Sequence, residues 1–430
     1  MKKFFLLYLV IFISNPLKSQ LLTIENAIDI TLKNNFDILI TRSNVDIDKA
    51  NNTLGNAGFL PTIGASGTGN VSQGSAKQIL SSGIESSSYN SVSKSVSGSI
   101  SLNWTLFDGG KMFITKNKLG EIEALGELLY KDSVMQAVFN VVAVYYNVVS
   151  QKQQLAAINE VITYNTELVK IFQTSFNAGL SPKTSLLQAQ IDLNVYKENA
   201  INQQSVIIDV KRGLNLILGR DANINFDVSD SIPLGQMPDK NRLVQKIDSV
   251  NISILEMQKS VEIARLASKE FSSLRYPKLI FNTSYSLAQS NNTFGFILQN
   301  NTYGPSVGAT ISIPIYQSGN INRQITVANL QLEQAKYGLQ ATKLGVNLQL
   351  QNALTTYENQ LQLLNIEKDN VALAKENMDI SIQRLRLGQT TILEVRLAED
   401  SYEQSRTRLT NFEYNLKIAE SKLKQLISEL

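Results

Sequence analysis

The chain of 430 residues contains no cysteine and no histidine. Thiol nucleophiles, imidazole bases and the commonest zinc and copper ligands are therefore unavailable. These absences disfavour an enzyme, and we expect neither a cofactor nor a metal site. Four acids, Asp29, Asp37, Asp46 and Asp48, fall in one predicted amphipathic helix, where they most simply form a solvated face.

Long hydrophobic runs are almost missing as well. Two lysines and an apolar run over residues 4–13 open the chain. This pattern is typical of a secretory signal peptide, here residues 1–19, and a short buried strand is the alternative. Cleavage there removes three lysines and no acid, so the formal charge falls from +3 to zero and nothing indicates a nucleic-acid partner. Without cysteine, the exported chain is expected not to be lipidated.

Beyond the signal peptide, no run of 18 or more apolar residues follows, so the sequence predicts no transmembrane helix. The nearest stretch, Val138 to Val149, is too short and is interrupted by asparagine and tyrosine. If the chain enters a membrane, it must do so with strands.

An internal repeat organises the chain. Residues 106–110 resemble residues 315–319, and the short motif around Gly179 resembles the one around Gly388, both at a shift of 209 residues. Two motifs that share one shift indicate duplication. A third motif pair, 59–61 and 275–277, has a shift of 216. The sequence therefore divides into a first repeat, a linker and a second repeat, which are residues 20–220, 221–239 and 240–430.

Each repeat is predicted to contain a helix, two strands, a very long helix and a further helix, in that order. The predicted elements of the first repeat are a helix at 24–56, strands at about 60–72 and 94–107, a long helix at 109–177 and a helix at 183–218. Those of the second are a helix at 240–274, strands at about 277–288 and 306–316, a long helix at 319–387 and a helix at 391–427. At 1.5 Å per residue, each long helix is ~100 Å long. The segments 73–93 and 289–305 are expected to be exposed loops, because they are rich in serine, asparagine and glycine.

The strands alternate between apolar and small polar residues. Val96, Ile100 and Leu102 share one face, for example, and serines occupy the positions between them. The alternation suits a membrane barrel and also a half-buried soluble sheet. Four strands cannot close a barrel, so a barrel requires several copies of the chain. Aromatic residues at all four strand–helix junctions favour the membrane, as an interfacial belt: Phe59, Phe107, Tyr276 and Tyr316.

The order of elements, the duplication, the exit from strand to helix at 106–110 and the glycine turns resemble the TolC family of outer-membrane efflux proteins. Residues 212–219 are also similar to the family's Leu-Asn-x-Leu-Leu-Gly signature. The resemblance covers nearly the whole mature chain. It implies a mixed fold, all-α plus membrane β-barrel, in which internally duplicated antiparallel coiled-coil helices form a periplasmic tunnel and each chain gives four strands to a trimeric 12-stranded barrel.

The resemblance also implies a function, partners and a location. The function is a passive duct of a tripartite efflux or type I secretion system. The partners are two further copies of the chain, a periplasmic adaptor protein, an inner-membrane pump of RND, ABC or MFS type, and outer-membrane lipid. The location is the outer membrane of a Gram-negative bacterium, with a long periplasmic extension. A structural coiled-coil envelope or fibre protein is the alternative from another class.

Two groups of site residues follow from the resemblance. The tip turns are expected to dock the adaptor: Ala178, Gly179, Leu180, Ser181, Leu387, Gly388, Gln389 and Thr390. The candidate periplasmic constriction consists of Glu394, Ser185, Thr390 and Leu397. The family's closing clasp pairs an arginine with an aspartate, and the matching positions here are Thr390 and Ser185. We therefore expect helix packing and neutral hydrogen bonds to close this entrance, with Glu394 as its acid, unless Glu394 is only a solvated charge beside Arg396.

Overall fold

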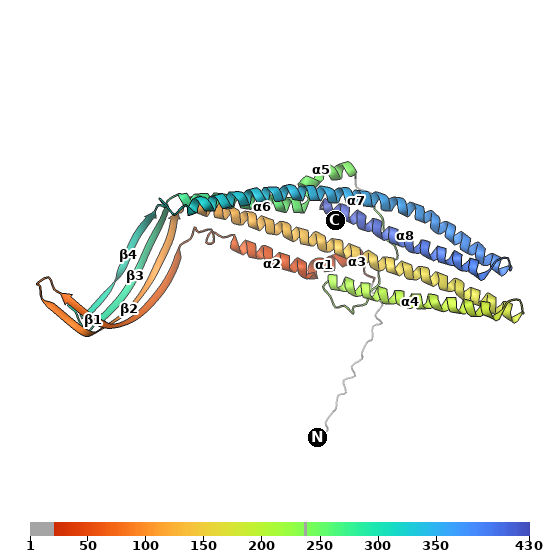
Figure 1. Cartoon of the computed structure of the whole chain (residues 1–430), viewed down its shortest axis with the longest axis horizontal. Helices are drawn as coiled ribbons and strands as arrows, with labels where there is room; N and C mark the ends of the chain where they lie inside the picture. Colours follow the sequence, from red (N-terminus) through yellow and green to blue (C-terminus); the bar gives the residue numbers. More distant parts are fainter. Residues whose placement is uncertain (1–20, 236–238) are drawn as a thin grey trace, which may run out of the picture. The chain divides into compact units, whose positions relative to one another are not determined.

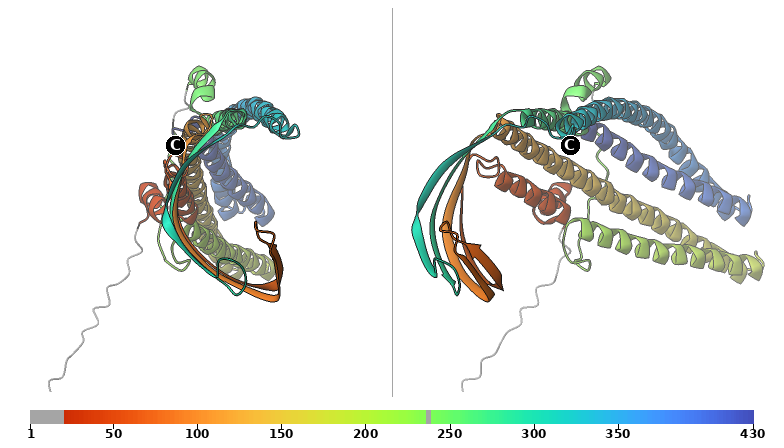
Figure 2. Two further views of the ribbon diagram at one scale, coloured as in Figure 1. Left: turned by 90° about the vertical axis from the view of Figure 1, so that its left-hand side faces the viewer. Right: turned by 60° about the vertical axis from the view of Figure 1, so that its left-hand side comes forward.

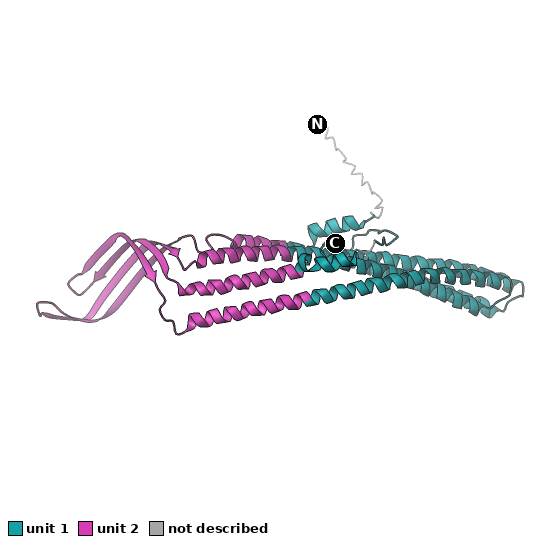
Figure 3. Cartoon of the chain, turned by 90° about the horizontal axis from the view of Figure 1, so that it is seen from above, with its two compact units in different colours: residues 1–41, 130–252, 344–430 teal, residues 42–129, 253–343 magenta. Residues whose placement is uncertain are grey.

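The computed structural model describes residues 21–235 and 239–430. The predicted signal peptide lies outside the described residues, as do residues 236–238 of the predicted linker. The chain forms two compact units (Figure 3). Unit 1 takes in the chain up to Thr41, Tyr130–Ile252 and Leu344–Leu430, and unit 2 consists of Arg42–Leu129 and Ser253–Lys343.

The elements follow one another in the order that the repeat predicts (Figure 1). Those of the first repeat are α1 (Ile24–Asn34), α2 (Phe36–Asn51), β1 (Thr62–Ile79), β2 (Glu85–Phe107), α3 (Lys111–Asn177) and α4 (Lys183–Ile217). Those of the second are α5 (Lys240–Val250), α6 (Ile252–Ser272), the short 3-10 helix η1 (Ser273–Arg275), β3 (Lys278–Asn292), β4 (Gln299–Ser312), α7 (Asn320–Arg386) and α8 (Ile392–Leu426). The long helices α3 and α7 contribute residues to both units.

The prediction of one continuous helix at the start of each repeat is wrong. The first breaks at Asn35 and the second at Asn251, where ψ is 126° and 123° instead of helical. Each asparagine side chain donates a hydrogen bond to a helix end: Asn35 to the carbonyl oxygen of Ile217 and Asn251 to that of Leu426, both at 2.9 Å. The last carbonyls of a helix have no partner within the helix, so these amides supply one.

These two contacts are copies of each other. Asn251 follows Asn35 by 216 residues, and Leu426 follows Ile217 by 209 residues, which are the two shifts found in the sequence motifs. The duplication therefore extends to individual hydrogen bonds in unit 1.

Unit 1 has a continuous apolar core around the middle of α3. Val141, Tyr145, Val148 and Val149 of α3 are almost fully buried and cluster with Leu214 and other residues. Among the described residues, α3 is the one helix with a stretch long and apolar enough to cross a membrane, and half of that stretch is buried. Its hydrophobicity is explained by this core, as expected for a packed helix.

Unit 2 contains an antiparallel sheet in the order β1-β2-β3-β4, whose strands curve together (Figure 2). The strands extend further into both hairpins than the sequence predicts. The prediction of loops at 73–93 and 289–305 is therefore wrong for most of these residues. Ala76–Ile79 pair with Glu85–Ser88, and Asn291 pairs with Gln299. Serine and asparagine are typical of loops, but backbone pairing with a neighbouring strand satisfies their amides equally well.

At its other end, β4 is shorter than predicted and stops at Ser312 instead of residue 316. Pro314 explains the early end, because proline has no N–H to donate to the sheet.

Candidate functional site

The two tip turns have the same backbone geometry. At the end of α3, the N–H of Gly179 donates to the carbonyl of Phe176 at 2.9 Å and that of Leu180 to Ser175 at 2.8 Å. At the end of α7, Gly388 donates to Leu385 at 3.0 Å, and the next residue donates in the same way. This is the Schellman arrangement, which requires a left-handed residue. Gly179 and Gly388 supply it, with φ of 72° and 68°.

The tips present apolar side chains to solvent. Leu180 is 83% exposed and Leu387 is 72% exposed. The neighbouring turn residues Ala178 and Gln389 are also exposed, and Ser181 is partly shielded. Each tip is a loop of five residues, 178–182 between α3 and α4 and 387–391 between α7 and α8, and each carries a large apolar side chain that the fold leaves in solvent.

Three of the four candidate constriction residues, Thr390, Glu394 and Leu397, lie where α7 turns into α8. Thr391 caps α8 by accepting a hydrogen bond from the N–H of Glu394 at 3.4 Å. The carboxylate of Glu394 lies 3.5 Å from Arg384, whose guanidinium also donates to the carbonyl of Gln389 at 3.2 Å. The charged neighbour of Glu394 is therefore Arg384, across the turn, whereas the sequence suggested Arg396.

The other three residues proposed for the constriction have different environments. Leu397 is 62% exposed on α8. Ser185 is partly shielded in the first turn of α4, where its N–H donates to the carbonyl of Pro182. The hydroxyl of Thr390 is buried and makes no hydrogen bond. The structure forms no ion pair between positions 185 and 390.

Apolar packing joins the four helices behind these turns. Phe172, Leu186 and Ala189 cluster with Leu385 and Ile392, so α3, α4, α7 and α8 all contribute. A second layer further along contains Leu168, Met378 and Val395, among others.

The tip region also contains charged pairs, which the sequence did not predict. Arg396 of α8 lies 3.4 Å from Asp192 of α4, and Arg386 of α7 pairs with Glu167 of α3. Sequence spacing did not reveal these pairs, because each joins helices from different repeats. The charged links lie beside the positions where the family places its clasp, not at them.

A carboxyl group is buried next to the first of these pairs. Glu399 of α8 is 1% exposed, and one of its oxygens accepts a hydrogen bond from Asn165 of α3 at 3.3 Å. The other oxygen has no partner. Burial raises the pKa of Glu399 to about 7, the bond from Asn165 opposes this rise, and the nearby carboxylates Asp192 and Asp400 add to it. No sequence signal distinguished this glutamate from the many other charges on α8.

The sheet of unit 2 has two chemically different faces, as its alternation predicts. On β2, Val96 and Ile100 are 67% and 61% exposed, while the intervening Ser97 and Ser99 are partly shielded. The register continues the apolar face across the other strands: Ile100 pairs with Ala65 and Tyr285. A broad exposed apolar face of this kind requires an apolar environment.

The four junction aromatics lie at the ends of the strands. Phe107, Tyr276 and Tyr316 are 45%, 60% and 82% exposed. Phe59 is less exposed, because its ring stacks edge to face on Phe113 with centroids 5.0 Å apart. The indole N–H of Trp104 donates to the carbonyl of Phe59 at 2.8 Å and fixes the start of β1.

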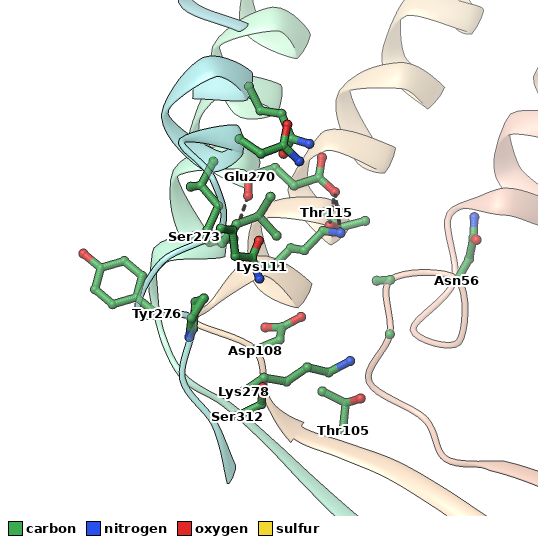
Figure 4. A pocket seen from close by; sticks show the side chains of 18 residues that line it. Asn56, Thr105, Asp108, Lys111, Thr115, Glu270, Ser273, Tyr276, Lys278 and Ser312 are labelled. Atoms are coloured by element: carbon green, nitrogen blue, oxygen red, sulfur yellow. Dashed lines mark hydrogen bonds and ion pairs between the residues drawn. The ribbon is translucent and has the colours of Figure 1, made fainter. Parts of the chain in front are cut away.

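A polar cavity, which the sequence did not indicate, lies where strands of both repeats turn into helices (Figure 4). Its wall includes Asp108, Lys111, Glu270 and Lys278. Burial alone would raise the pKa of Glu270, but hydrogen bonds from Lys118 and Thr115 hold it below its usual value. These residues lie far apart in the sequence, so only the fold brings them together.

Comparisons with known proteins agree with this geometry. The family model for outer membrane efflux proteins matches residues 27–220 and 243–429. The chain is 22% identical to the outer membrane protein TolC of Escherichia coli over 362 residues, which cover 79% of this chain and 70% of TolC. It is 23% identical to the outer membrane efflux protein BepC of Brucella suis over 405 residues, 92% of this chain and 83% of BepC.

The fold is also that of a solved outer membrane protein. The structure superposes on VceC from Vibrio cholerae with a TM-score of 0.77 at 14% identity, over 94% of this chain and 95% of VceC. The predicted fold class, long helices with a four-stranded β domain, is confirmed. With both halves of the chain matched by the family model, this chain belongs to the family of outer membrane efflux proteins, the TolC-like channels of the bacterial outer membrane.

Proposed function

We propose that three copies of this chain form a passive duct through the outer membrane, which receives its cargo from a periplasmic adaptor and an inner-membrane pump. The sheet is the observation that carries the proposal. Its edge strands β1 and β4 are 18 and 14 residues long, and neither has a neighbour on its outer side within the described chain.

Long unpaired strand edges are not stable within a membrane, because lipid cannot replace the missing hydrogen bonds. Pairing β4 of one copy with β1 of the next satisfies both edges. Three copies close a barrel of 12 strands with the apolar face toward lipid, and the junction aromatics then lie at the periplasmic interface. The number three comes from the family resemblance.

In this duct the tip turns dock the adaptor. The exposed Leu180 and Leu387 are the residues we expect at the centre of the contact. Replacing each in turn with a photo-crosslinking amino acid should capture a periplasmic protein in growing cells. The same probe at Leu344, which is 74% exposed on α7, is the matched control and should not capture that protein.

The entrance lies at the same turns, with Glu394 as the acid that three copies would bring together. Apolar packing behind the turns, together with the Arg396–Asp192 pair, holds it closed. Opening therefore requires α4 and α8 to separate at a charged contact as well as at apolar ones.

Extraction of membranes separates this function from the alternative, a structural coiled-coil or fibre protein. The duct should remain with outer membranes in urea and be released only by detergent, because its sheet is buried in lipid. A protein that urea washes off the membrane would contradict the proposal. The hypothesis of a fibre protein is not favoured, because it gives no role to a sheet with one exposed apolar face.

A further inference from the structure

The face of the sheet opposite the apolar side chains carries no charge across its middle. Five successive rows of four paired residues run across β1, β2, β3 and β4 on this face. Every residue in them is serine, threonine, asparagine, glycine or alanine. The rows are Thr62-Asn103-Asn282-Gly308, Gly64-Ser101-Ser284-Ser306, Ser66-Ser99-Ser286-Gly304, Thr68-Ser97-Ala288-Thr302 and Asn70-Ser95-Ser290-Asn300.

The charged residues of the four strands all lie away from these rows. Lys278 lies beyond one end, at the start of β3. Lys77 and Glu85 lie beyond the other end and form an ion pair with each other. Lys94 alternates onto the opposite face, where it pairs with Val71.

The hydroxyl groups of this face bond to one another. Ser66 and Ser99 are 2.9 Å apart, Thr68 and Ser97 2.6 Å, and the hydroxyls of Ser284 and Ser306 2.8 Å. A hydroxyl both donates and accepts and carries no net charge, so these pairs favour neither sign of charge.

We propose that the part of the passage lined by these five rows does not sort solutes by charge, so that this part passes cationic, anionic and neutral cargo alike. The inference rests on the proposed duct, in which this face lines the water-filled interior. Channels select ions with rings of charged side chains, and three copies of the chain would turn any charged residue of these rows into such a ring. No row supplies one, so any selection by charge takes place elsewhere along the duct.

The absence of native cysteine permits a direct test in the full chain. Ser99→Cys places a single thiol in the middle row, and Ile100→Cys places one on the opposite face. Each variant, in isolated outer membranes, is treated with two methanethiosulfonate reagents of similar size, one cationic and one anionic. The ratio of the two rates, divided by the same ratio for a small free thiol, reports the local potential.

We expect the normalised ratio at Ser99→Cys to lie within about threefold of one, which corresponds to less than about 0.7 kcal/mol. A larger departure in either direction would overturn the inference. Adding Ser101→Asp, one row away, should raise the cationic rate relative to the anionic rate by more than about threefold, because it creates a ring of carboxylates. If Ser101→Asp left the ratio of the two rates unchanged, the inference would also be overturned, because charge on this wall would then not affect which solutes reach it.

The same experiment separates this inference from the proposed duct. The duct requires that Ser99→Cys reacts and that Ile100→Cys, facing lipid, does not. If neither thiol reacts, or both react equally fast, the duct itself is wrong, whatever the ratio of the rates.

Discussion

An arginine in the middle of the apolar sheet face should prevent the chain from entering the membrane, whereas one on the neighbouring polar position should not. Leu102 lies five residues before Phe107, the aromatic at the end of β2. At ~3.3 Å per residue and a strand tilt of ~40°, it lies ~13 Å from the level of that aromatic. The apolar band of such barrels is ~25 Å tall, so Leu102 falls near its centre.

Leu102→Arg should therefore cost about 2–4 kcal/mol per copy, or about 6–12 kcal/mol for the proposed trimer, which is enough to abolish assembly. Ser101→Arg is the matched control, because the same side chain then faces the interior. The assay is the fraction of each variant found in urea-resistant outer membranes, compared with the unaltered chain. Equal assembly of both variants would refute the assignment of the two faces, and loss of Ser101→Arg alone would reverse it.

Three further predictions concern unit 1. Glu394→Lys should change the conductance of the duct in lipid bilayers more than Glu429→Lys does. Glu429 is a matched control, because both acids are about half exposed and lie within 3.5 Å of an arginine, and an equal change in conductance would remove Glu394 from the constriction. Glu399→Gln should leave the melting temperature nearly unchanged at pH 4 and raise it at pH 8, where the gain in stability reaches about 3 kcal/mol. The raised folded pKa of Glu399 means that its contribution to stability is lost as the pH rises from about 4.5 through about 7, so a pH-independent effect would contradict this. Asn35→Ala and Asn251→Ala should each destabilise the chain by about 1–3 kcal/mol, because each removes the hydrogen-bond donor of a helix-end carbonyl. Very unequal losses of stability in denaturant unfolding would contradict equivalent roles for the two asparagines.

The sequence predicts most of this fold because its signals are periodic and occur twice. The long helix expected at 109–177 is observed as Lys111–Asn177, and that expected at 319–387 as Asn320–Arg386. The glycines at 179 and 388 mark both turns, since few other residues adopt the left-handed conformation.

What the sequence does not predict depends on contacts between distant segments. The helix breaks at Asn35 and Asn251 carry no proline or glycine, and their cause is a hydrogen bond to a helix end some 180 residues away. The Arg396–Asp192 pair and the burial of Glu399 depend on how α4 packs against α8, which helix periodicity does not fix. The composition of the serine-rich strand ends predicts loops, because their pairing comes from the neighbouring strand and not from their own residues.

In the proposed duct, an open sheet of four strands spans the membrane only when copies of the chain pair along its edges. The mass of the detergent-solubilised protein, measured by native mass spectrometry, tests this most directly. We expect a complex of three chains that survives at concentrations where weak assemblies dissociate. A single chain that is stable in detergent and still embedded in outer membranes would contradict it.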